Sequence, residues 1–140
     1  MYKKILVPVD GSEGSWNCLA AAKMIAEKFG AKLVVLNVVQ RLAGASILAG
    51  PIDAASVNEG MQELAEKLMD AAREKVGDVD AEFVLDCGRP SKVIVNTAKD
   101  KGCDLIVIGS RGLSGFAEFF LGSVSSEVAQ LSTVPVLIVK

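Results

Sequence analysis

Two kinds of segment alternate along the chain, and they differ in their pattern of hydrophobic positions. Five short segments are rich in Val, Ile and Leu, and four of them read as nearly continuous apolar runs. Such runs are typical of strands that are covered on both faces, as in a parallel sheet. The segment at 81–87 alternates more clearly between apolar and polar residues, which indicates an edge strand. The five predicted strands are residues 3–9, 32–39, 81–87, 104–110 and 134–140.

Between these strands, apolar residues recur every three or four positions, as they do on one face of a helix. The first predicted helix ends before Gly30 and the second before Gly77, since glycine is common directly after a helix. A third helix begins near Pro90, and a fourth stops before Pro135. The second helix is expected to bury one stripe of apolar residues: Val57, Met61, Leu64, Leu68, Ala72 and Val76.

Strands that alternate with helices in this way form a parallel sheet with helices on both faces. Because crossover connections are right-handed, the sequence predicts a doubly wound α/β fold with strand order 3-2-1-4-5. Ligands bind such sheets at the carboxyl ends of the strands where the winding reverses, here between the first and fourth strands. The two loops at that point are PVDGSEGS (8–15) and IGSRGLSG (108–115).

Composition excludes several classes of function. The net charge of -2 leaves no basic excess for binding nucleic acid. The chain has no histidine, which excludes Ser-His-Asp and Cys-His triads and every zinc site that relies on imidazole. No apolar run approaches the ~20 residues of a membrane helix. The first apolar run ends at Pro8 and is too short for a signal peptide, so we expect a cytoplasmic protein without a membrane partner.

The loop that follows the fourth strand is dense in glycine and serine. Residues 109–112 (GSRG) open it, and Gly122 and Ser123 come directly before the fourth helix. Backbone N–H groups in a glycine-rich turn, together with the unpaired amides of a helix N-terminus, form a concave set of donors for phosphate. Ser123 and Ser125 add hydroxyl donors, and Arg111 adds a positive charge. Neither G-x-x-x-x-G-K-[ST] nor G-x-G-x-x-G occurs, and Ser123 could equally cap a helix beside an ordinary turn.

Gly109, Gly112, Gly122 and Ser123 form the pattern G-x-x-G, nine residues, then G-[ST]. This pattern resembles the ATP-binding motif of the universal stress protein family. The segments ILVPVDGSEGS and VPVLIVK are similar to that family's opening and closing strands, so the resemblance covers the whole chain. It implies one domain over residues 1–140, built as a flavodoxin-like three-layer sandwich. It also implies ATP or AMP as the ligand, with Mg²⁺ or Mn²⁺ bridging the phosphates.

The resemblance implies a role for each site residue. Pro8, Val9 and Asp10 would contact the adenosine part of the nucleotide, with Asp10 as its polar anchor. Val38 would offer backbone groups to the edge of the adenine, and Ile108 would pack beside the base. The ribose and the phosphates would lie against the remaining predicted residues: Gly109, Ser110, Arg111, Gly112, Gly122, Ser123, Val124 and Ser125.

Nothing in the sequence supplies the groups that phosphoryl transfer normally requires, so no catalytic or metal-ligating residue is predicted. We expect a nucleotide-responsive regulatory protein with at most slow ATP hydrolysis and a protein partner that the sequence does not identify. Binding would order the segment 110–122 and, if it is a lid, 40–56. The apolar edge strand at 134–140 indicates a homodimer.

Other interpretations of the same residues stay open. Asp10 could cap the first helix in competition with Ser12, a role that is compatible with ligand binding. The long segment 40–56 could be a plain insertion instead of a lid or an interface. Two other functions are a dimeric interaction protein that binds no nucleotide and a flavodoxin-like module that binds FMN.

Overall fold

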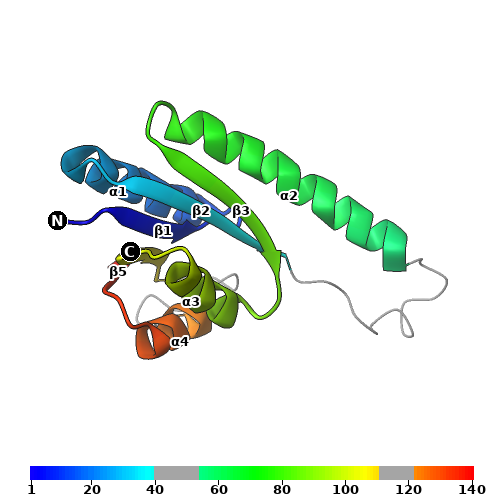
Figure 1. The fold of residues 1–140 in the computed structure, drawn as a ribbon. Coiled ribbons are helices and arrows are strands. Elements are labelled where there is room, and N and C mark those ends of the chain that lie inside the picture. Colours follow the sequence, from blue (N-terminus) through cyan, green and yellow to red (C-terminus); the bar gives the residue numbers. More distant parts are fainter. Residues whose placement is uncertain (40–53, 111–121) are drawn as a thin grey trace.

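A computed structural model describes residues 1–39, 54–110 and 122–140, without the side chains of 54–58. In this part of the chain, strands and helices alternate along the sequence (Figure 1). The strands are β1 (Lys4–Pro8), β2 (Lys32–Val39), β3 (Ala81–Cys87), β4 (Leu105–Gly109) and β5 (Val136–Val139). The helices are α1 (Glu13–Phe29), α2 (Ala54–Val76), α3 (Pro90–Asp100) and α4 (Ser123–Leu131).

The strands form one parallel sheet in the order β3-β2-β1-β4-β5, which confirms the predicted fold class. The segment 81–87 is an edge strand, as its alternating pattern predicts. Helices α1 and α2 cover one face of the sheet, and α3 and α4 cover the other (Figure 1). The winding therefore reverses between β1 and β4, at the point that the sequence indicates.

The core consists of two layers, one on each face of the sheet. On β1, Ile5 and Val7 belong to the layer under α1 and α2, whereas Leu6 belongs to the layer under α3 and α4. All three side chains are fully buried. Each contributes about 1.5–3 kcal/mol of burial free energy, which is why the central strands carry apolar residues without alternation.

Within the described side chains of α2 the predicted buried stripe is wrong at Leu64, and Val57 lies outside them. Leu64 is 67% exposed, and the neighbouring Ala65 is buried in its place. Successive residues of a helix point about 100° apart, and at this turn Ala65 faces the core while Leu64 faces solvent. The first turns of α2 also extend beyond the carboxyl end of β3, where no strand lies beneath them (Figure 1). Farther along the helix the prediction is confirmed, since Ala72 and Val76 are buried.

Across the described ranges, none of the helices combines the length and the apolar character that crossing a membrane requires.

Candidate functional site

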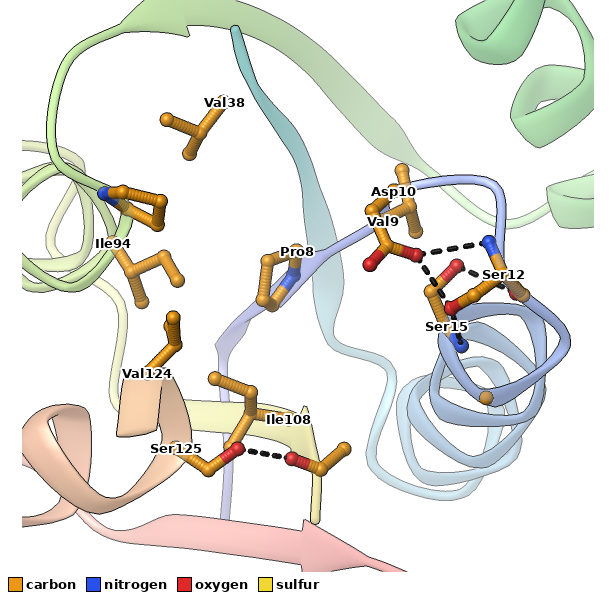
Figure 2. Close-up of a pocket in the computed structure, with 13 residues that line it drawn as sticks. Pro8, Val9, Asp10, Ser12, Ser15, Val38, Ile94, Ile108, Val124 and Ser125 are labelled. Atoms are coloured by element: carbon orange, nitrogen blue, oxygen red, sulfur yellow. Dashed lines mark hydrogen bonds between the residues drawn. The ribbon is translucent and has the colours of Figure 1, made fainter. Parts of the chain in front are cut away.

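A cavity with a volume of about 120 Å³ opens at the carboxyl ends of β1, β2 and β4 (Figure 2). It lies where the winding of the sheet reverses, which is the usual ligand position in this class of fold. The residues that line it are Pro8, Val9, Asp10, Ser12, Gly14, Ser15, Val38, Pro90, Ile94, Ile108, Gly109, Val124 and Ser125.

The wall of the cavity has an apolar part and a polar part. Figure 2 shows the apolar side chains on one side of Pro8 and the polar groups at the start of α1 on the other. The apolar part suits a flat aromatic ring, and the polar part suits a group that carries hydroxyls. Side chains of the apolar part come from β2, α3, β4 and α4: Val38, Pro90, Ile94, Ile108 and Val124.

The polar part is a chain of hydrogen bonds at the N-terminus of α1. Asp10 Oδ1 accepts bonds from the Ser12 N–H at 2.9 Å and from the Ser12 hydroxyl at 2.5 Å. Ser12 Oγ in turn accepts the Ser15 N–H at 3.2 Å, so Ser12 is the residue that caps the helix. Asp10 holds the capping residue and does not cap the helix itself. No group of the described residues bonds to Asp10 Oδ2, which leaves this oxygen for a ligand.

One buried amide fixes the chain where β1 ends. The Val9 N–H still donates to the Leu36 carbonyl at 2.8 Å and so continues the bonding between β1 and β2. The Val9 carbonyl accepts a bond from Asn37 Nδ2 at 2.7 Å. The sequence analysis missed Asn37, although a single polar residue inside the apolar run KLVVLNVV was a signal that could have found it.

The N-terminus of α4 forms the side of the site next to β4. Gly122 is its N-cap and makes no side-chain capping bond. The Gly122 N–H donates to the Ser110 carbonyl at 2.7 Å, which ties the start of the helix to the end of β4. The N–H groups of Ser123, Val124 and Ser125 occupy the first turn, where helical amides have no acceptor within the helix.

Ser125 does not place its hydroxyl where the sequence analysis expected it. Its side chain is buried, and the hydroxyl donates to the carbonyl of Gly109 (Figure 2). In this arrangement Ser125 connects α4 to β4 and can offer a ligand only its main-chain N–H. The side chain of Ser123, in contrast, is exposed.

The structure brings most of the predicted residues together. Ser110, Gly122 and Ser123 are described but do not line the cavity, whereas Arg111 and Gly112 lie outside the described residues. Most of the segments 40–56 and 110–122, which were expected to respond to the ligand, also lie outside them. The predicted residues that do line the cavity are Pro8, Val9, Asp10, Val38, Ile108, Gly109, Val124 and Ser125.

Sequence reasoning missed Pro90 and Ile94 as part of the wall. A signal for them existed, because α3 follows β3 and must begin at the same edge of the sheet as the predicted site.

Asp10 is the charged residue of the cavity wall as far as it is described. Behind it, burial raises the pKa of the Cys18 thiol from 9.0 to about 11, and the negative charge of Asp10 acts in the same direction. Cys18 is therefore a neutral thiol near pH 7 and is no nucleophile. In the described ranges, no three His, Cys, Asp or Glu side chains are grouped as they would be to ligate a metal.

Comparison with known proteins gives a consistent picture. The model of the Universal stress protein family matches residues 1–140. Universal stress protein YxiE of Bacillus subtilis (strain 168) is 41% identical over 148 residues, which cover 100% of both chains. The structure of universal stress protein UspA from Lactobacillus plantarum is similar with a TM-score of 0.86, at 26% identity, over 99% of this chain and 98% of that one. A universal stress protein solved in complex with cAMP has a TM-score of 0.71, at 30% identity, over 99% of this chain and 96% of that one.

Proposed function

Because this chain belongs to the universal stress protein family, we propose that it binds an adenine nucleotide, ATP or AMP, in the cavity at the carboxyl ends of β1, β2 and β4. The observation that carries the proposal is the combination found at this edge of the sheet. An apolar slot, a carboxylate oxygen without a partner among the described residues and the first turn of a helix lie around one cavity. A related protein of similar fold was solved with cAMP, which contains the same base and sugar.

The chemistry of the wall suggests how the nucleotide lies. The base would occupy the apolar part, with its edge toward the main chain of Val38 and with Ile108 packed beside the ring. The ribose hydroxyls would donate to Asp10 Oδ2. The phosphates would meet the N–H groups of the first turn of α4, which are positively polarised. The predicted contacts of Ser110, Arg111, Gly112 and Gly122 belong to this part of the proposal.

A divalent cation fits this site only as a partner of the phosphates. Asp10 is the carboxylate of the described wall, and one of its oxygens already bonds to Ser12. Mg²⁺ prefers six oxygen ligands and commonly takes several of them from a nucleotide and from water. In this proposal, Mg²⁺ or Mn²⁺ bridges the phosphate oxygens and neutralises their charge.

The chain would act as a cytoplasmic, nucleotide-responsive regulator that works as a homodimer. The described part of its wall presents binding groups but no pair of groups for activating water, so we expect ATP hydrolysis to be slow at most. Strand β5 is an edge of the sheet, and Leu137 on it is 40% exposed. Pairing with β5 of a second copy across a twofold axis would satisfy that edge.

The test begins with the freshly purified protein, which is denatured so that any released nucleotide can be identified. Titration calorimetry with ATP and magnesium then measures affinity. The variant Gly122→Val with Ser123→Ala changes the start of α4 and should abolish tight binding. Gly60→Val is the matched control, since a Cβ at Gly60 meets no atom of the described residues within 4 Å. Absence of binding by the unmodified protein would overturn the proposal in favour of an interaction protein.

A further inference from the structure

Val38 directs both of its main-chain polar groups toward the cavity side of β2. The Leu36 carbonyl accepts the Val9 N–H at 2.8 Å on the β1 side of the strand, whereas the Val39 carbonyl accepts the Gly88 N–H at 3.3 Å on the β3 side. Along a parallel strand these directions alternate from one residue to the next. The N–H and the C=O of Val38 therefore face the β1 side, as those of Leu36 do.

Strand β1 ends at Pro8, which pairs with Leu36, so no residue of β1 lies opposite Val38. If the ladder continued, the Val38 N–H would donate to the Val9 carbonyl. That carbonyl instead accepts Asn37 Nδ2 at 2.7 Å, and no hydrogen bond joins Val38 to Val9 in the described structure. The Asn37 side chain is buried, with 7% exposure, so it is held in this position by packing. Asp10 follows directly, at the point where the chain turns toward α1.

We infer that Asn37 is a positioning residue that sets base specificity, because its bond holds the Val9 carbonyl turned away from the Val38 N–H and so leaves the Val38 N–H and C=O to the ligand. This inference rests on the proposed function. A free N–H beside a free C=O complements adenine, whose ring N1 accepts a hydrogen bond and whose N6 amino group donates one. Guanine presents a donor at N1 and an acceptor at O6. Its N1–H would therefore face the Val38 N–H, and its O6 would face the Val38 carbonyl, so neither pair could form a hydrogen bond. An unmatched polar group in a desolvated site discriminates strongly between ligands.

The substitution Asn37→Leu tests the inference, because leucine has a similar volume but no donor. The Val9 carbonyl can then be satisfied by the Val38 N–H, which extends the ladder and closes the binding edge. We expect the affinity for ATP to fall about tenfold, the effect of one lost hydrogen bond in a desolvated site, and the ratio of ATP to GTP affinity to fall with it. Thr97→Val is the control, since Thr97 has the same 7% exposure but does not line the cavity.

A second measurement does not depend on how well the variant folds. Hydrogen exchange of the Val38 amide, followed by NMR in the wild-type protein, should be fast without nucleotide and slowed by ATP but not by GTP. A merely structural role of Asn37 would lower stability without changing the choice between the two bases.

The outcomes separate the inference from the proposed function. If the wild-type protein binds neither ATP nor GTP, the proposed function fails and the inference fails with it. If the wild-type protein binds ATP but Asn37→Leu keeps both its ATP affinity and its ATP-to-GTP ratio, the inference alone is overturned. The same holds if the Val38 amide is protected from exchange before any nucleotide is added.

Discussion

The hydroxyl of Ser125 has two candidate roles, and the substitution Ser125→Ala separates them. In the structure this hydroxyl is buried and donates to the Gly109 carbonyl, so it joins α4 to β4. A hydrogen bond of this kind contributes about 0.5–1.5 kcal/mol to stability, and leaving a buried carbonyl unpaired costs about 1–3 kcal/mol. Alanine is the better helix former by about 0.5 kcal/mol, which offsets part of the loss.

The neighbouring substitution Ser126→Ala supplies the reference for this experiment. It makes the same change in the same turn of α4, so it carries the same gain in helix propensity. Relative to Ser126→Ala, we expect Ser125→Ala to lower the free energy of unfolding by about 1–2 kcal/mol. For a chain of 140 residues this corresponds to a fall in Tm of about 3–7 °C.

Thermal unfolding by circular dichroism and ATP titration of both variants together give the answer. Because the hydroxyl is engaged within the fold, ATP affinity of Ser125→Ala should stay within about threefold of the wild-type value, a change of less than 1 kcal/mol. The reasoning is refuted if Ser125→Ala is as stable as Ser126→Ala while its ATP affinity falls tenfold or more. The hydroxyl would then serve the phosphates, as the family resemblance implies.

Further substitutions and treatments have definite expected outcomes. Gly11→Ala should lower the free energy of unfolding, measured by urea denaturation, by about 1–2 kcal/mol. Gly11 has φ of 86°, and a Cβ there would lie 3.1 Å from a leucine side chain. Gly60→Ala, on an exposed turn of α2, should instead stabilise it by up to about 1 kcal/mol. Stability should fall as pH rises from 9 to 11, since the unfolded chain ionises the Cys18 and Cys103 thiols in that range while burial keeps the folded pKa of each near 11. Cys18→Val should remove only the Cys18 part of this fall in stability. At neutral pH, iodoacetamide should label the exposed Cys87 long before the buried Cys18. Leu137→Asp should give a monomer in light scattering at micromolar concentration, and an unchanged dimer would place the contact elsewhere.

Much of the site can be read from local patterns. Short apolar runs and helical stripes identify the elements, and their order along the chain leads to the reversal between β1 and β4. The loop after β1 and the start of α4 are then brought to one edge of the sheet. Asp10, Ile108 and Val124 do lie around one cavity for this reason. At Leu64 the helical pattern does not predict burial correctly, since an apolar residue can match the helical period and still point to solvent.

The sequence by itself determined the types of the elements, their order and the edge at which a ligand would bind, because these depend on hydrophobic periodicity and on the handedness of crossovers. Only the tertiary structure decided which polar groups are already paired. The Ser125 hydroxyl meets a carbonyl 16 residues away, and the Asn37 amide meets one 28 residues away. Such partners are chosen by where the chain passes in space, and the same serine or asparagine carries an identical sequence signal whether it serves the fold or a ligand.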